Sequence, residues 1–421
     1  MYTMVYKFRR KMYSSGMNTT FIKRQVAAPI EKTLARGKSL LLLGPRQCGK
    51  TTLIEKYFKA DISISFLRSE SRQRYEQSPD VLIHEIEASL KTSRKIPLIF
   101  IDEVQKVPQI MDAIQYLIDK KMAQFILTGS SARKLRRGQH INLLPGRLIV
   151  MHVDPLNIQE IAHLNISLEQ LLLYGSLPEI LLEKNDGAKE ETLHAYVNTY
   201  LEEEIRAEAL VRKVSLFSRF LELAASEAGG MINLQKLSQE LGVSRITIQN
   251  YFEILEDCLV AEKIEPYFNS KNNIRQRLSR ASKYLLFDLG IRRISAKEGT
   301  QLPLKMMGYL FEQFIGLELL RQTRLIKPTV KVCYWRDHNG PEVDYVLVQD
   351  KKVTPIEVKW SETPDKTDIK HLHFFMDLYN VKQGYIICRT PHKMLITPDI
   401  IALPWQALAE VVKAEGENDK K

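Results

Sequence analysis

Nine consecutive residues combine glycine, lysine and hydroxyl side chains in a spacing that suits phosphate. They are Gly44, Pro45, Arg46, Gln47, Cys48, Gly49, Lys50, Thr51 and Thr52. An apolar run precedes them and a helix-like stretch follows, as the phosphate-binding loop G-x-x-x-x-G-K-S/T requires. Lys50 is placed to reach the β- and γ-phosphates and the Thr51 hydroxyl to bind Mg²⁺. The pattern therefore predicts a site for ATP and Mg²⁺, with an ordinary glycine turn as the alternative.

An acidic pair follows a second apolar run, residues 98–101. Asp102 and Glu103 end this run, so they are expected at the carboxyl edge of a sheet, where open α/β folds bind ligands. Asp102 would hold Mg²⁺ through its water shell, and Glu103 would polarise the attacking water. Such a pair alone usually belongs to a solvated loop, but its position about 50 residues after a phosphate loop favours the catalytic interpretation.

Three further residues are candidates near the same site. Ser130, in the run Thr-Gly-Ser-Ser after an apolar stretch, would contact the γ-phosphate or the water, and a simple Ser/Gly turn is the alternative. Arg147 precedes the last apolar run and could serve as an arginine finger in cis or in trans, or be a surface arginine. Cys48 lies beside a lysine and a helix start, which predicts thiolate character, and a residue that only fills a variable position of the loop is the alternative.

The alternation of apolar runs and helical stretches over residues 20–165 predicts an α/β domain with a parallel sheet. The strands are expected at residues 39–43, 62–66, 98–102, 124–128 and 148–152, and the helices at 26–36, 50–59, 81–90 and 109–120.

Residues 166–300 are mostly helical by pattern and contain a helix-turn-helix signal. Residues 234–241 and 245–256 form the two helices, and a strand or wing is expected at 259–266. Polar side chains cluster at the start of the second helix, at Arg245, Thr247, Gln249 and Asn250. This winged helix and the basic stretch 271–283 suggest contact with DNA or RNA. Winged helices also serve as packing modules or lids.

Residues 301–421 carry strand-like runs around a D-x₁₂-E-x-K pattern. The spacing puts Glu357 and Lys359 on one face of a strand, and Asp344 on the partner strand can share that face. Glu312, on a preceding helix, could add a third carboxylate. These carboxylates would bind Mg²⁺, and Lys359 would orient the attacking water or stabilise the pentavalent phosphorus during phosphodiester cleavage. The alternative is a solvated hairpin face.

Composition limits the remaining possibilities. The chain has 421 residues and a formal net charge of +11. Residues 1–19 are expected to form a flexible basic arm, and the alternative is that residues 1–16, before Met17, are upstream sequence translated from a misplaced start. The clustered charge suggests a polyanionic partner, although solubility alone would also explain it. No apolar run approaches the roughly 20 residues that a bilayer requires, so no membrane contact is expected. Four widely spaced cysteines indicate a reducing cytoplasm.

Several motifs occur here in one order. They are residues 44–51, 102–103, 128–131, 145–147, 174–178, the winged helix, 284–288, and Asp344 with 357–359. In this combination the chain resembles a widespread bacterial and archaeal family of AAA-type ATPases. The resemblance implies an additional-strand P-loop domain followed by a C-terminal region with the PD-(D/E)xK restriction-endonuclease-like fold. That family usually has two glycines before its aromatic-proline pair, whereas Ser176 and Leu177 follow Gly175 here.

Three functions are consistent with these residues. The leading hypothesis is a Mg²⁺-dependent ATPase that acts as a nucleotide-driven switch on nucleic acid. One alternative is an ATP-gated, metal-dependent nuclease, and another is a non-enzymatic regulator that binds DNA through the winged helix. The sequence leaves the oligomeric state open.

Overall fold

The computed structural model describes residues 21–93, 95–131, 144–201, 214–268, 281–337 and 340–414. The basic arm, residues 1–19, and residues 271–280 of the basic stretch lie outside these ranges. Within them, no helix is long and apolar enough to cross a membrane.

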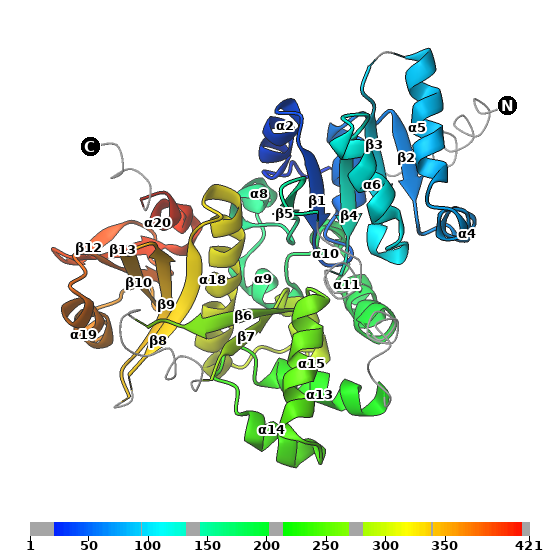
Figure 1. Cartoon of the computed structure of the whole chain (residues 1–421). Helices are drawn as coiled ribbons and strands as arrows, with labels where there is room; N and C mark the ends of the chain where they lie inside the picture. Colours follow the sequence, from blue (N-terminus) through cyan, green and yellow to red (C-terminus); the bar gives the residue numbers. More distant parts are fainter. Residues whose placement is uncertain are drawn as a thin grey trace.

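The first part of the described chain forms a five-stranded parallel sheet, coloured blue to teal in Figure 1. Its strands are β1 (Ser39–Leu43), β2 (Ile62–Ser65), β3 (Leu98–Asp102), β4 (Gln124–Gly129) and β5 (Leu148–His152). Their order is β2-β3-β4-β1-β5, so β4 lies between the strand before the glycine loop and the strand that ends in Asp102. This inserted strand confirms the predicted α/β, additional-strand class.

Helices cover both faces of this sheet, which explains why β1 is buried throughout and apolar from Leu40 to Leu43. Leu41 and Leu43 pack in the core beneath α5 and α6, whereas Leu40 and Leu42 pack on the opposite face beneath α2 and α3. The helices around this sheet are α2 (Ala27–Ala35), α3 (Lys50–Tyr57), α4 (Ser69–Gln77), α5 (Val81–Thr92) and α6 (Ile110–Asp119). The sequence did not predict α4, because it buries only Tyr75 and lacks an apolar stripe.

The middle part is mostly helical and contains one strand pair. Its described helices are α8 (Ile158–Ile161), α9 (Leu168–Tyr174), α10 (Pro178–Leu182), α11 (Asp186–Ala195), α13 (Val214–Ser226), α14 (Leu234–Leu241), α15 (Arg245–Asp257) and α17 (Leu289–Ser295). The Ser244 hydroxyl accepts a hydrogen bond from Thr247 N and so caps α15. After α15, strand β6 (Ala261–Pro266) pairs antiparallel with β7 (Lys283–Leu286).

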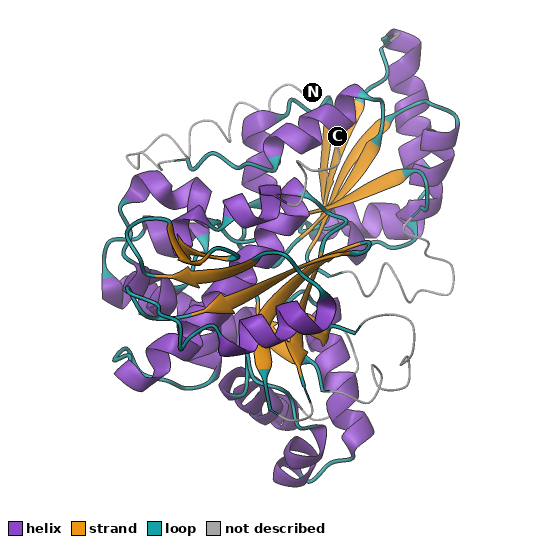
Figure 2. Ribbon diagram, turned by 90° about the vertical axis from the view of Figure 1, so that its left-hand side faces the viewer, coloured by secondary structure: helices purple, strands orange, loops and turns teal. Residues whose placement is uncertain are grey.

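The last part contains an eight-stranded sheet in the order β12-β13-β11-β10-β9-β8-β6-β7. Its own elements are α18 (Leu304–Ile326), β8 (Lys331–Arg336), β9 (Glu342–Gln349), β10 (Lys352–Val358), α19 (Lys370–Tyr379), β11 (Gly384–Cys388), β12 (Met394–Thr397), β13 (Ile400–Pro404) and α20 (Ala409–Ala414). Strands β8, β9 and β10 run antiparallel, and β11 joins β10 in parallel. Figure 2 shows the two sheets of the molecule, each flanked by helices.

The second sheet crosses the predicted domain boundary at residue 300. Glu265 of β6 pairs with Cys333 of β8 in parallel, so the middle strand pair continues the C-terminal sheet. The middle and last parts of the chain are therefore joined by main-chain hydrogen bonds.

A buried carboxylate joins two motifs that are distant in sequence. Asp288 is fully buried and accepts hydrogen bonds from Ser176 N at 2.7 Å, Gly290 N at 2.9 Å and Ile291 N at 3.2 Å. Gly175 precedes Ser176 with φ 77° and ψ −157°, a conformation that essentially only glycine adopts. A Cβ atom on Gly175 would lie 2.0 Å from Asp288 Oδ1. The junction between α9 and α17 therefore requires glycine at this position.

Replacing Gly175 with alanine is expected to destabilise the fold. The added Cβ would overlap the Asp288 carboxylate and the backbone would be strained, at a cost on the order of 3 kcal/mol or more. Thermal unfolding monitored by circular dichroism measures the effect. Gly37→Ala is the matched control, because Gly37 has φ +70° but nothing within 4 Å of its added Cβ. Equal melting temperatures for the two variants would contradict this account.

Candidate functional site

The glycine loop connects β1 to α3 in the conformation that its sequence predicts. Gly49 caps α3 with φ 89°, and Gln47 also has a positive φ of 60°. The Lys50 ammonium donates hydrogen bonds to Gly44 O and Pro45 O, each at 2.7 Å. Gly44 N donates to Gly129 O at 3.2 Å, which fastens the loop to the end of β4. Thr52 lies exposed on the first turn of α3.

Asp102 lies directly opposite the start of α3. Its Oδ1 accepts the Thr51 hydroxyl at 3.1 Å and the Thr128 hydroxyl at 2.6 Å. Burial raises the pKa of Asp102. A hydroxyl and a carboxylate at this separation form the kind of oxygen donor set that Mg²⁺ prefers. Thr51 and Asp102, predicted from separate motifs, fit a magnesium site together.

Glu103 is held by two neighbouring side chains. Its Oε2 accepts hydrogen bonds from Ser130 Oγ at 2.9 Å and from Gln105 Nε2 at 2.6 Å. Gln105 Nε2 also donates to Ser130 Oγ at 3.0 Å, so the three side chains form a closed triangle. Thus the predicted residues Glu103 and Ser130 lie together.

Gln105 was missed by the sequence reasoning. It lies two residues after Glu103 and is only 4% exposed, and its Oε1 is buried with no hydrogen-bond partner. In the sequence it is only a polar residue between Val104 and Val107, a pattern that occurs in many helical turns. Only the fold reveals that this side chain contacts Glu103.

A second missed residue, Arg24, fastens the loop from behind. Its guanidinium donates to Cys48 O and to Asp154 O, each at 2.6 Å, and pairs with Glu160 at 3.2 Å. On another side of the loop, Tyr196 Oη donates to Arg46 O at 3.3 Å. The loop is therefore held by the segment before α2 and by the helical part.

The expected thiolate at Cys48 is wrong. The side chain is fully buried in the apolar core with Leu42 and Leu53, and its Sγ lies 2.9 Å from Pro45 O. Burial raises the pKa of Cys48 and outweighs the opposing charges of Lys50 and Arg24. Cys48 is therefore a packing residue that carries a protonated thiol at neutral pH.

Arg147 cannot act on a nucleotide that is bound to the glycine loop of the same chain. Leu148, the next residue, pairs with Ser39, whereas the loop follows Leu43 at the other end of the parallel strand β1. The two ends of a strand this long are roughly 15 Å apart. The Arg147 guanidinium instead makes two hydrogen bonds to exposed Asp119, at 2.6 and 3.0 Å. A role in cis is excluded, and a role in trans stays a prediction.

The second sheet brings the predicted C-terminal residues into one region. Asp344 lies on β9, Glu357 on β10, Lys359 just after β10 and Glu312 on α18. Val358 N donates to Asp344 Oδ2 at 2.8 Å, and Lys359 Nζ pairs with Glu357 Oε1 at 2.8 Å. Burial and the nearby Asp344 carboxylate raise the pKa of Glu312 to about 7 and that of Glu357 to about 8.

These carboxylates are not arranged around a metal position. Lys283, which the sequence reasoning counted only as part of the basic stretch, pairs with Glu312 at 3.1 Å and with Glu342 at 2.7 Å. In the part of the chain that the structure describes, no group of three or more metal-ligating side chains is placed to hold an ion. The expectation that Glu312, Asp344 and Glu357 converge on one Mg²⁺ is therefore not met in this conformation. Lysines pair with Glu312 and with Glu357, and Asp344 accepts a hydrogen bond from Val358 N.

The predicted groove-reading helix, α15, presents a polar start. Arg245, Gln249 and Asn250 are exposed and Thr247 is half-buried. Lys283 is the only basic residue of the stretch 271–283 within the described ranges, and its side chain is 5% exposed. It is engaged with carboxylates and is not available to a nucleic acid.

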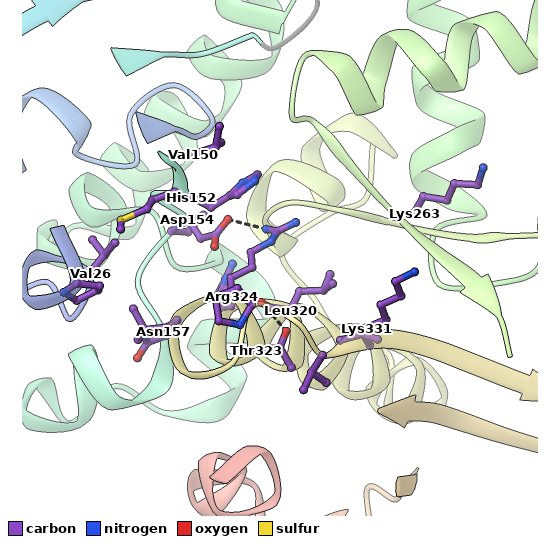
Figure 3. Close-up of a pocket in the computed structure, with 18 of the residues that line it drawn as sticks. Val26, Val150, His152, Asp154, Asn157, Lys263, Leu320, Thr323, Arg324 and Lys331 are labelled. Carbon is purple, nitrogen blue, oxygen red and sulfur yellow. Dashed lines mark hydrogen bonds and ion pairs between the residues drawn. The ribbon is translucent and has the colours of Figure 1, made fainter. Parts of the chain in front are cut away.

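A cavity of about 740 Å³ separates the first sheet from the second (Figure 3). Strand β5 lies on one side, and α18, β6 and β8 line the others. Arg324 of α18 spans it, pairing with Asp154 at 2.8 Å and with Glu262 of β6 at 2.6 Å. Because Arg24 binds both Asp154 O and Cys48 O, a continuous polar chain connects the glycine loop to β6.

Family models match three successive parts of the chain. Residues 36–162 match the model described as "AAA domain". Residues 165–301 match "Domain of unknown function (DUF8612)", and residues 307–408 match "Domain of unknown function (DUF4143)".

Two curated relatives align over most of this chain. Uncharacterized protein Rv2008c of Mycobacterium tuberculosis is 25% identical over 344 residues, which cover 81% of this chain and 75% of the relative. Uncharacterized protein MJ1544 of Methanocaldococcus jannaschii is 23% identical over 370 residues, which cover 81% and 79%.

Among solved structures, the Walker-type ATPase PABY2304 of Pyrococcus abyssi aligns with a TM-score of 0.45 and 15% identity over 65% of this chain and 96% of its own. Cdc6p from Pyrobaculum aerophilum aligns with a TM-score of 0.30 and 12% identity over 67% and 95%. These scores are too low to describe the arrangement of the whole chain. The AAA-domain match and the order of the strands assign residues 36–162 to the AAA-type P-loop ATPases.

Proposed function

We propose that this chain is a Mg²⁺-dependent ATPase that acts as a nucleotide-driven switch. The observation that carries the proposal is the polar network at the carboxyl edge of the first sheet. There the loop, the acidic pair and the end of β4 are joined through Thr51, Asp102, Glu103 and Ser130. These residues supply the functions that hydrolysis of a phosphoanhydride requires.

Each residue has a distinct role in this proposal. Lys50 leaves its loop carbonyls and pairs with the β- and γ-phosphates, while the loop N–H groups bind phosphate oxygens. Thr51 and Asp102 hold Mg²⁺, which neutralises phosphate charge. Glu103 accepts a proton from the attacking water, and Gln105 and Ser130 hold its carboxylate in place.

Contacts between the first sheet and the strand pair support the switch. Ser131, one residue beyond Ser130, donates to Asp257 O at 3.5 Å, and Asp257 is the last residue of α15. Leu259, in the turn that follows, packs against the core of the first sheet. A rearrangement around the γ-phosphate at Ser130 would therefore reach α15 and β6 directly.

Nucleic acid is the partner that the chain's chemistry favours. Three helices followed by an antiparallel strand pair is the element order of a winged helix, and the start of its last helix exposes Arg245, Gln249 and Asn250. With the formal net charge of +11, this order supports contact with DNA or RNA.

Replacing Lys50 with alanine, or Glu103 with glutamine, is expected to abolish ATP turnover. Lys50→Ala removes the ammonium that binds phosphate, so it should also weaken ATP binding, whereas Glu103→Gln should retain ATP. Phosphate release measures turnover and calorimetry measures binding. Lys56→Ala is the matched control, because Lys56 is an exposed lysine on the same helix. Full turnover in both site variants would refute the ATPase assignment.

Replacing Gln105 with leucine is expected to lower kcat by roughly 10- to 100-fold with little change in the Kd for ATP, since Glu103 loses a donor that orients it. Single-turnover hydrolysis and ATP calorimetry separate the two quantities. Gln109→Leu, at an exposed glutamine a few residues along the chain, serves as the control. A change in ATP affinity without a change in kcat would contradict the positioning role.

A second candidate function, an ATP-gated nuclease, is favoured by the C-terminal topology. The order helix α18, strands β8, β9 and β10, helix α19 and strand β11 supports the endonuclease-like fold that the resemblance implies, and Asp344, Glu357 and Lys359 lie in one region of it. Because Lys359 pairs with Glu357 and Lys283 pairs with the neighbouring Glu312, a gating step has to precede any metal-dependent cleavage.

If the chain is such a nuclease, nicking of supercoiled plasmid is expected only with Mg²⁺ and ATP together, and Asp344→Asn should abolish it. Agarose electrophoresis measures the nicked product. Asp350→Asn is the control, because Asp350 lies in the exposed turn after β9. Absence of cleavage under every nucleotide condition would remove this candidate and leave the ATPase proposal intact.

A further inference from the structure

The buried Lys283 ammonium lies between two half-buried carboxylates as a bound cation would. Its Nζ is 2.7 Å from Glu342 Oε1 and 3.1 Å from Glu312 Oε1, and it lies 5.1 Å from the centre of the Tyr334 ring. Its side chain is 5% exposed. A buried charge is tolerated only when it is paired, so this lysine and these two carboxylates depend on one another.

The lysine and the carboxylates come from different parts of the fold. Lys283 is the first residue of β7, where it pairs with Ile264 of β6 and bridges to Met231. Glu312 belongs to α18 and Glu342 to β9. The strand pair of the middle part therefore places the Lys283 ammonium beside carboxylates of the C-terminal part.

Two further carboxylates, Asp344 and Glu357, lie near this ion pair and could bind additional positive charge. Asp344 lies two residues after Glu342 on the same strand, so the two side chains share one face of β9. Glu357 uses one oxygen for Lys359, and its other oxygen, Oε2, is buried without a hydrogen bond. Fully ionised, Glu312, Glu342, Asp344 and Glu357 carry four negative charges. Three positive charges face them, from Lys283, from Lys359 and from Arg336, whose guanidinium pairs with Glu342 at 3.3 Å. Without Lys283 the deficit would be two charges, which equals the charge of one divalent cation.

We propose that Lys283 is an internal cation that takes the place of a divalent metal between Glu312 and Glu342, and that the C-terminal cluster binds such a metal only when Lys283 is removed. The proposal goes beyond the ATPase function and would explain how the nuclease activity, the second candidate function, is kept inactive. It requires no nucleotide, so it stands or falls separately from ATP hydrolysis.

The same strand pair is attached to the ATPase part. Strand β6 begins soon after Asp257 and Leu259, which contact Ser131 and the core of the first sheet. A shift of that turn would move β6 and, through their pairing, β7 with Lys283. The lysine thus has a direct mechanical connection to the nucleotide site.

Binding of Mn²⁺ to the full-length chain without nucleotide tests the proposal, with paramagnetic resonance reporting the bound ion. The wild-type chain is expected to bind no Mn²⁺ at this cluster. Lys283→Met should gain a single site, with affinity at least about tenfold above any background binding. Adding Glu312→Gln to Lys283→Met should remove that site again. Lys263→Met, at an exposed lysine on β6, is the matched control and should behave as wild type.

Two results would overturn the inference. One is a Mn²⁺ site in the wild-type chain that Glu312→Gln abolishes, and the other is a folded Lys283→Met variant that gains no site. If Lys283→Met does not fold alone, because Glu312 and Glu342 lose their partner, refolding with Mn²⁺ should recover it. A third result would also count against the proposal. In that case Mn²⁺ fails to recover Lys283→Met, although the triple variant Lys283→Met, Glu312→Gln, Glu342→Gln folds normally.

Discussion

One buried carboxylate, Asp102, fixes the geometry at the carboxyl edge of the first sheet. It accepts hydroxyl groups from Thr51 at the start of α3 and from Thr128 near the end of β4. Because β4 lies between β1 and β3, these two bonds connect the glycine loop with the strand that carries the acidic pair. A carboxylate buried without such donors would be costly, so the strand order and this polar network depend on each other.

Buried charged pairs carry the connections between the parts of the molecule. Arg24 joins the loop backbone to Asp154 and Glu160, and Arg324 joins Asp154 to the strand pair. Arginine suits this role because its planar guanidinium can donate to several acceptors at once. In the C-terminal sheet Lys283 makes the corresponding connection with an ammonium. Each link would break at a large cost, so the parts are expected to move in discrete steps.

The strands of the first sheet and the glycine loop could be predicted because each depends on nearby residues. A strand that helices cover on both faces is apolar on both sides, so it can be recognised as a continuous apolar run in the sequence. The loop glycines act through their own backbone conformation, which also depends on local sequence alone. Around this sheet, the errors concern Cys48 and Arg147. A lysine near Cys48 suggested a thiolate, but burial decides its pKa. Arg147 precedes a strand whose parallel direction puts it at the edge away from the loop.

The sequence by itself determined the phosphate-loop motif, the acidic pair, the alternation of elements and the candidate carboxylates of the last part. Only the tertiary structure decided that Gln105 contacts Glu103, that Arg24 holds the loop and that Lys283 occupies the C-terminal cluster. The reason is physical. The state of a buried polar side chain depends on its loss of water and on partners such as Glu160, 136 residues from Arg24, and neither can be read from local spacing.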